Sequence, residues 1–231
     1  MAQETMFGEH WIAIGPVSLS ETVLTTWCVM AILAIAASIM TRRLKIHPST
    51  GQAALEAIVS MIEDAIVAVA PDHAKLLLPF VGTFWVFLVI ANLVGLVPGL
   101  HSPTGDLSAT AAFAILVFFA SHWFGIRDQG LANYLKHYLT PSPLLLPFHI
   151  ISEITRTVAL SVRLFGNIMS LEMAALLILF VAGFLVPVPI LMLHIIEALV
   201  QAYIFGMLAL IYIAGGLQSQ ALHSRNEEED E

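Results

Sequence analysis

The sequence is poor in charged residues and in cysteine. Only 11% of its 231 residues are charged, against about 25% in a typical soluble domain. The single cysteine, Cys28, lies in an apolar run, which excludes an internal disulfide and leaves no cysteine cluster for zinc. There is no basic patch to suggest nucleic acid and no Gly-x-x-x-x-Gly-Lys loop to suggest nucleotide binding. No lysine or arginine precedes the first apolar run, so we expect no cleavable signal peptide.

Hydrophobic residues make up 58% of the chain, more than a soluble fold of this size could hide from water. A membrane-spanning helix needs roughly 20 apolar residues. Five segments qualify, at residues 22–40, 76–97, 107–126, 148–185 and 190–217. We therefore predict an all-α membrane protein with about five transmembrane helices. The last two segments are long, which predicts strong tilt, and the loop Val186–Pro189 separates them.

Basic residues give the orientation. Arg42, Arg43 and Lys45 follow the first span, and Arg127 and Lys136 follow the third. Because positive residues concentrate on the cytoplasmic side, residues 1–21 are expected outside the cell. The same rule makes residues 218–231 a cytoplasmic tail. Most of the net charge of −8 falls in the last five residues, which predicts a solvated, disordered end.

Residues 48–70 differ from the spans because acids interrupt an apolar helical pattern. Glu56, Glu63 and Asp64 fall among leucine, isoleucine and valine at helical spacing. This pattern predicts an amphipathic helix at the cytoplasmic membrane surface. No composition shift marks a second domain, so residues 1–231 form one membrane domain.

Ionisable residues within the apolar segments are the main functional signal. A charge at bilayer depth costs roughly 2.5–3.5 kcal/mol on insertion scales. Arg163 cannot be deprotonated and therefore needs a negative partner or water. Asn167, Ser170 and Arg156 share its helical face, whereas Glu172 is about 180° round the helix. The alternative is an arginine that binds another helix or reaches the membrane interface.

The last segment carries a polar stripe of His194, Glu197 and Gln201. Histidine and glutamate exchange protons, so this stripe suits a proton or cation relay. It could instead hold neighbouring helices together through hydrogen bonds. A metal site is disfavoured because no second pair of ligands accompanies it. Asn92 is interpreted as helix glue, and Asp106 as a turn or helix cap.

The stretch Arg163-Leu164-Phe165-Gly166-Asn167 resembles the signature of the a subunit family of F-type ATP synthases. Several surrounding features agree with it: Glu153-Ile154-Thr155-Arg156, Glu172, His194, Gln201-Ala202-Tyr203-Ile204-Phe205 and Asn92-Leu93. The resemblance covers most of the chain. Three positions depart from it: Glu197 is an extra acid, Thr157 replaces an expected proline, and His149 replaces a common glutamate.

The resemblance implies a bacterial inner-membrane stator that loads and unloads ions on the carboxylates of a c-ring and so couples ion flow to ATP synthesis. It implies H⁺ as the ion, with Na⁺ as the alternative, and c-ring and b-type peripheral-stalk subunits as partners. Residues 148–217 become the helical hairpin that faces the rotor. Arg163 becomes the essential cation, and the ion pathway contains Asn167, Glu172, His194 and Gln201. The extra acid Glu197 is added to this pathway because it belongs to the polar stripe with His194 and Gln201. No cofactor is implied, and catalysis occurs outside this chain.

Two other readings remain at this stage. A stand-alone secondary transporter would use Arg163 to hold an anionic substrate, but it predicts inverted repeats, and none is evident. An intramembrane enzyme would use His194 and Glu197, but it needs a nucleophile or a metal set, and neither is apparent.

Overall fold

A computed structural model describes residues 10–14, 17–42, 45–46, 48–97, 100–131, 134, 146–182 and 187–229. Within them lie six α-helices: α1 (Glu21–Thr41), α2 (Thr50–Val69), α3 (Ala74–Val94), α4 (Leu107–Gln129), α6 (Leu146–Ala182) and α7 (Pro187–Glu229). Each of these helices except α2 is long and apolar enough to cross a membrane. The predicted fold class and number of spans are confirmed.

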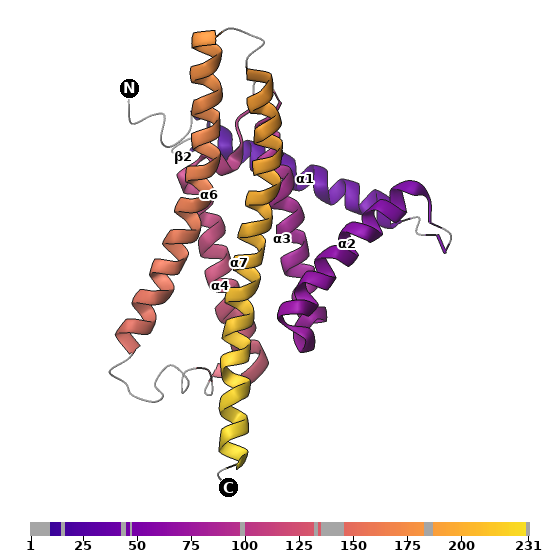
Figure 1. Cartoon of the computed structure of the whole chain (residues 1–231), viewed down its shortest axis with the longest axis vertical. Coiled ribbons are helices and arrows are strands. Elements are labelled where there is room, and N and C mark those ends of the chain that lie inside the picture. Colours follow the sequence, from indigo (N-terminus) through magenta and orange to yellow (C-terminus); the bar gives the residue numbers. More distant parts are fainter. Residues whose placement is uncertain are drawn as a thin grey trace.

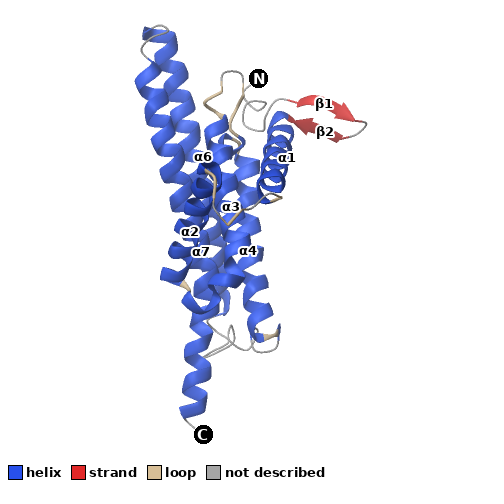
Figure 2. Ribbon diagram, turned by 90° about the vertical axis from the view of Figure 1, so that its right-hand side faces the viewer, coloured by secondary structure: helices blue, strands red, loops and turns tan. Residues whose placement is uncertain are grey.

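A short antiparallel hairpin precedes α1, with strands β1 (His10–Ile14) and β2 (Val17–Ser20). It projects to one side of α1 (Figure 2). We did not predict it, although the β-branched and aromatic residues around Gly15-Pro16 were an available signal. Because the hairpin precedes the first span, it does not alter the count of membrane helices.

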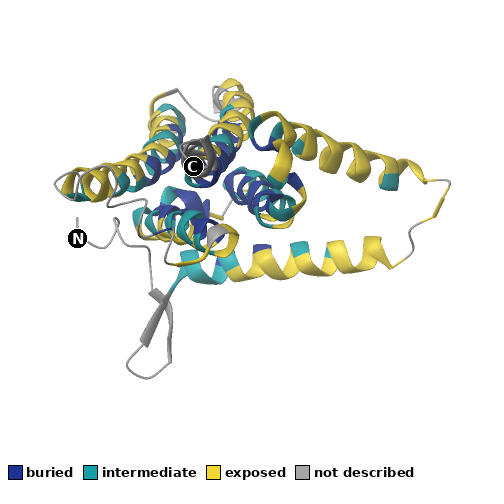
Figure 3. Ribbon diagram, turned by 90° about the horizontal axis from the view of Figure 1, so that it is seen from below, coloured by how far each residue is buried: buried dark blue, intermediate teal, exposed yellow. Residues whose placement is uncertain are grey.

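Four helices, α3, α4, α6 and α7, pack into an elongated bundle, and α1 and α2 extend from it as two arms (Figure 1). Seen from below, the buried residues lie on the inward faces of the four bundle helices, and the arms are mostly exposed (Figure 3). One buried cluster joins α3, α4, α6 and α7 through Phe84, Leu88, Ala114, Val117, Leu160, Leu164, Ala202, Phe205 and Ala209. A second cluster joins α2 to α3, α4 and α7 through residues that include Ile66, Leu77, Trp85, Phe124 and Leu210.

Close packing between α3 and α7 depends on Gly206. A Cβ atom at this position would lie 2.8 Å from two carbons of the Trp85 ring. Trp85 is itself buried, and its ring also lies 5.6 Å from that of Tyr203 on α7. The absent side chain therefore sets how near the two helices approach.

The α7 helix differs from its prediction at both ends. It begins at Pro187, inside the predicted loop, because proline is tolerated in the first turn, where its missing N–H costs nothing. It also continues to Glu229, so the expectation of a disordered tail is wrong for the residues up to that point. The sequence has no proline after Pro189, so nothing there forces the helix to end. The apolar span inside α7, Leu191–Leu217, agrees with the prediction.

The α2 helix confirms the helix predicted at residues 48–70. Ile66 anchors it in the bundle, while Leu55, Ile58 and Met61 are exposed. Its position at the membrane surface stays a prediction, as do the tilt of α6 and α7 and the single-domain organisation. Most of the predicted cytoplasmic connection, from residue 135 to 145, lies outside the described residues.

Candidate functional site

Arg163 lies near the middle of α6, inside a segment apolar enough to span a membrane, and its side chain is exposed. On the same helix, Leu160 and Leu164 are buried in the bundle. The α6 helix therefore packs through its leucines and presents the arginine at the surface of the chain. Among the described residues, none forms a hydrogen bond or salt bridge with the guanidinium.

Gln201 on α7 is the polar residue that connects α7 to the arginine-bearing helix. Asn167 Nδ2, one turn beyond Arg163, donates a hydrogen bond to Gln201 Oε1 at 2.5 Å. Gln201 is only 1% exposed, and its Nε2 has no partner in the described chain. The structure thus brings together two of the predicted site residues and leaves one amide donor available.

Glu172 reaches from α6 to the connection between α3 and α4. Its carboxylate oxygens would lie 3.2 Å from a Cβ at Gly95 and 3.1 Å from a Cβ at Gly105. Two glycines therefore make room for this acid, and Glu172 does not pair with Arg163, as the helical geometry predicted. Its Oε1 is buried without a hydrogen-bond partner in the described chain.

His194 on α7 is 3% exposed, and its Nε2 also lacks a partner in the described chain. With His101, it is one of the two basic side chains that act electrostatically on the Glu172 carboxylate. A buried polar atom left without a partner costs about 1–3 kcal/mol. The orphan atoms of Glu172, His194 and Gln201 therefore mark places where water or a transferred proton would be stabilised.

Asn92 ties the α3–α4 connection to α7. Its Nδ2 donates to the carbonyl of Ala198 at 3.1 Å, and its Oδ1 accepts from Thr104 Oγ1 at 2.7 Å. Thr104 and Ser102 hydroxyls lie 2.6 Å apart, and Ser102 Oγ donates to the Ala91 carbonyl. We call Asn92, Ser102, Thr104, Glu172 and His194 the loop-side cluster. Sequence reasoning found Asn92 as helix glue, but it missed the two hydroxyls, which read as ordinary turn residues.

Asp106 and Glu197 are the remaining acids of interest near this end. Asp106 caps α4 by accepting from the backbone N–H and the hydroxyl of Ser108, each at 2.8 Å, so the cap prediction is confirmed. It also accepts from Thr22 Oγ1 of α1 at 2.8 Å. Glu197 is half-buried on α7, and its place in an ion pathway stays a prediction. No metal-binding group of three histidines, cysteines or acids occurs among the described residues.

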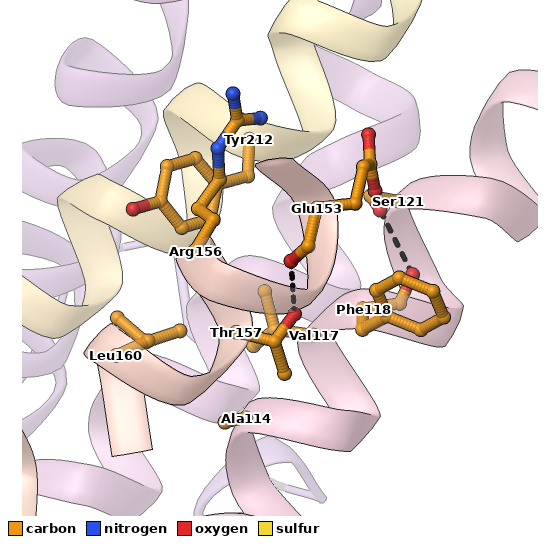
Figure 4. Close-up of a pocket in the computed structure, with 9 residues that line it drawn as sticks. All are labelled: Ala114, Val117, Phe118, Ser121, Glu153, Arg156, Thr157, Leu160 and Tyr212. Atoms are coloured by element: carbon orange, nitrogen blue, oxygen red, sulfur yellow. Dashed lines mark hydrogen bonds between the residues drawn. The ribbon is translucent and has the colours of Figure 1, made fainter. Parts of the chain in front are cut away.

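A second polar site lies where α4, α6 and α7 meet, at the other end of the bundle from the loop-side cluster. We call it the junction pocket; Figure 4 shows its lining residues, Ala114, Val117, Phe118, Ser121, Glu153, Arg156, Thr157, Leu160 and Tyr212. The Arg156 guanidinium lies over the Tyr212 ring, 4.8 Å from its centre. His122 Nε2 of α4 lies 3.7 Å from Glu153 Oε2. Sequence reasoning placed Arg156 on the helical face of Arg163 and cited Glu153 as part of the motif, but it did not predict this pocket.

A profile of the ATP synthase A chain family matches residues 23–214, which include α3, α4, α6, the part of α7 up to residue 214, and both polar sites. The chain belongs to the ATP synthase A chain family. It is 65% identical to ATP synthase subunit a 1 of Hahella chejuensis over 90% of this chain and 88% of that protein. It is 60% identical to ATP synthase subunit a 2 of Pelobacter propionicus over 94% of this chain and 95% of that protein.

A third relative, ATP synthase subunit a of Legionella pneumophila, is 55% identical over 98% of this chain and 99% of that protein. The similarity to ATP synthase A chains therefore extends over nearly the whole of both chains. The family expected from the Arg163–Asn167 signature is confirmed.

Proposed function

We propose that the chain carries protons through two half-channels to and from the carboxylates of a c-ring, and that Arg163 stands between the half-channels. Membership of the family makes this chain the proton-translocating stator subunit of an F-type ATP synthase, a multi-pass membrane protein of bacterial type. The roles of individual residues, the partners and the orientation belong to the proposal.

The exposed arginine is the observation that carries the proposal. Arg163 is in an apolar spanning segment, has no partner in the described chain and lies at the bundle surface. A permanent cation at that depth requires an anion or water outside the described chain. An acid on a neighbouring subunit satisfies this requirement. A transporter with an internal substrate site would instead enclose the arginine, and Arg163 does not line the junction pocket.

The fixed charge would act on each rotor acid in turn. A carboxylic acid that faces lipid stays neutral, because a bare charge there is costly. Near Arg163 the carboxylate is favoured, so the proton leaves. The same cation blocks a direct leak of protons between the half-channels. Each proton therefore crosses by riding the rotor, and it gains roughly 2.3 kcal/mol per 100 mV of membrane potential.

The loop-side cluster supports an outer half-channel. Glu172 and His194 each have a buried atom without a partner in the described chain, and both lie toward the α3–α4 connection. Asn167 and Gln201 continue the polar path along the α6–α7 contact toward Arg163. The path would thus lead from the side of the α3–α4 connection to the centre of α6.

The positive residues support the orientation. Arg42 and Lys45 follow α1, and Arg127 lies in the last turn of α4. Both helix ends are cytoplasmic by the positive-inside rule, which places the N-terminus and the α3–α4 connection outside and the C-terminus inside. The same orientation places the junction pocket on the cytoplasmic side. The proposal includes b-type peripheral-stalk subunits as further partners and the bacterial plasma membrane as the location.

The decisive experiment replaces the arginine in the assembled enzyme. We expect Arg163→Ala to reduce ATP-driven proton pumping by inverted membrane vesicles to background, because no charge remains to discharge the rotor acids. Arg127→Ala is the matched control, since this arginine is also exposed but lies at the end of α4. Immunoblots would establish equal amounts of both variants in the membrane. Pumping by Arg163→Ala at the rate of the control would contradict the proposal.

A further inference from the structure

The outer half-channel has an acid, Glu172, but the sequence assigns no counterpart to the cytoplasmic side. Glu153 lies ten residues before Arg163 on α6, and Glu172 lies nine residues after it. At 1.5 Å of rise per residue, the two acids stand about 15 Å and about 14 Å from the arginine, in opposite directions. One helix therefore carries an acid at a similar distance on each side of its fixed cation.

Glu153 is also placed where it could meet both the rotor and the bundle. Helical geometry sets it about 80° round α6 from Arg163, at the border of the arginine's face. Its side chain is 26% exposed, and it lines the junction pocket with Arg156, Tyr212 and Ser121. Figure 4 shows the Arg156 side chain lying over the Tyr212 ring, within the same pocket as Glu153.

The ring of His122 is held so that one nitrogen is turned to this acid. Its Nδ1 lies 2.8 Å from the Phe118 carbonyl oxygen, which can only accept, so Nδ1 carries a hydrogen. In the neutral imidazole, Nε2 is then the basic nitrogen, and it lies 3.7 Å from Glu153 Oε2. The centre of the Tyr134 ring lies 6.0 Å from that of the imidazole. A proton on either His122 Nε2 or Glu153 Oε2 would make that atom the donor to the other, across slightly more than a hydrogen-bond length.

The pocket itself has room for water beside the acid. It leaves about 20 Å³ for the centres of water-sized molecules, and one water needs roughly 10–15 Å³ by this measure. Hydroxyls of Ser121, Thr157 and Tyr212 lie among its lining residues and could support such a water. A water here would contact Glu153 from the pocket side, because His122 is not among the lining residues.

We propose that Glu153 and His122 form the cytoplasmic proton station of the stator, which rests on the proposed function above. During synthesis, Glu153 takes the proton that leaves a rotor acid, and its carboxylic O–H bond then breaks as an N–H bond forms at His122 Nε2. The imidazolium releases the proton to cytoplasmic water, and Glu153 is again a carboxylate. ATP-driven pumping runs the same transfers in reverse.

Other ionisable groups lie on the described elements around this pair. Arg156 and His149 lie on α6, three residues after and four residues before Glu153. Tyr212 comes from α7, and Tyr134 follows α4. His149 carries a second imidazole, so only the part of the pH dependence that His122→Gln removes is assigned to the relay.

The test uses the complete enzyme in inverted vesicles, whose cytoplasmic face is outward. We expect Glu153→Gln to lower the initial rate of ATP-driven pumping at least tenfold, since a lost acid–base group typically costs about 100-fold or more. We expect Glu153→Asp to restore part of the rate. Glu56→Gln is the matched control, because Glu56 is exposed on α2 and also faces the cytoplasm in this orientation.

His122→Gln tests the relay without removing the acid. Wild-type pumping should depend on external pH in part through this imidazole, and His122→Gln should remove that part of the dependence. A merely structural role for His122 would change the amount of enzyme and not the shape of the profile. An unchanged profile overturns the relay, even where Glu153→Gln assembles poorly.

The outcomes separate this inference from the proposed function. If Glu153→Gln pumps like its control while Arg163→Ala is inactive, the cytoplasmic station is wrong and the rotor-facing arginine stands. If Arg163→Ala also pumps normally, the proposed function itself fails.

Discussion

Single residues in this chain differ in how far their surroundings satisfy them. Leu160 and Leu164 are buried by neighbouring helices, as apolar residues in a bundle should be. Arg163, between them on the same helix, finds no partner in the described chain. Gln201 is intermediate, because one end of its amide is bonded to Asn167 and the other is buried without a partner. Residues whose polar atoms are incompletely satisfied are therefore the best candidates for function.

Gln201 gives a prediction at this scale. Gln201→Leu keeps the side-chain size but removes the acceptor for Asn167 and the buried Nε2 donor. We expect pumping to fall by up to roughly tenfold, since the net loss of one hydrogen bond is about 0.5–1.5 kcal/mol. The residual rate should exceed that of Arg163→Ala, because the essential charge remains.

Val200→Leu is the control, as Val200 is exposed beside Gln201 on α7. Parallel pumping assays on vesicles with equal amounts of enzyme would measure the difference. An inactive Gln201→Leu enzyme that is correctly assembled would show that this amide is as necessary as the arginine.

The sequence predicts some residue-scale features and misses others for a physical reason. Charges in apolar segments are visible without any structure, because their cost depends on the segment around them. Arg163, Glu172 and His194 were identified in this way. Ser102 and Thr104 were missed because serine and threonine are common in turns. Their importance comes from contacts with α3, where Thr104 bonds to the Asn92 side chain and Ser102 to the Ala91 carbonyl.

Whole elements follow the apolar pattern closely. The spans were predicted because a long apolar stretch without charge indicates a membrane helix whatever it packs against. The start of α7 was misplaced because proline ends some helices and begins others. The sequence alone does not show which of the two occurs at Pro187. The continuation of α7 to Glu229 was missed because an acidic run favours solvent but does not forbid a helix.

Gly206 gives a prediction for the packing of two elements. Gly206→Ala places a methyl group 2.8 Å from the Trp85 ring, so α3 and α7 must move apart or the indole must turn. Overpacking of this kind costs about 1–3 kcal/mol. We expect a smaller amount of this variant in the membrane. We also expect the detergent-solubilised enzyme to lose activity at a lower temperature than the wild type.

Gly215→Ala is its counterpart, because a Cβ at Gly215 meets nothing within 4 Å. Alanine also favours a helix over glycine by about 1 kcal/mol, so this variant should be at least as stable as the wild type. Equal stability of the two variants would mean that α3 and α7 are less closely fixed than the structure indicates.

At the scale of the whole molecule, the chain has the surface of one part of an assembly. The α1 arm exposes Trp27, Ile32, Ile35 and Ile39, and α6 exposes Phe148, Val158 and Val162 as well as Arg163. Lipid can cover the apolar residues, but it cannot neutralise the arginine. The arrangement of the arms around the bundle could not be predicted from the sequence, because it depends on contacts between residues far apart in the chain.

We therefore predict that purification in mild detergent recovers this chain with a ring of small hairpin subunits. Because the charged contact at Arg163 lies at membrane depth, where salt screens little, the association should survive a salt wash. Arg163→Ala should bind the ring less tightly, as measured by the ratio of the two subunits after a salt wash. Recovery of a lone monomer that transports a solute would contradict the rotary reading.

The connection between α3 and α4 has a consequence for anyone who alters this protein. Loops usually accept insertions because their backbone is solvated. Here Ser102 and Thr104 are as deeply buried as the helices they join, and their hydroxyls are bonded to Asn92 and to the Ala91 carbonyl. An epitope tag or protease site inserted at this turn would displace the backbone that surrounds Glu172. The turn is therefore a poor site for insertions, although it connects two helices.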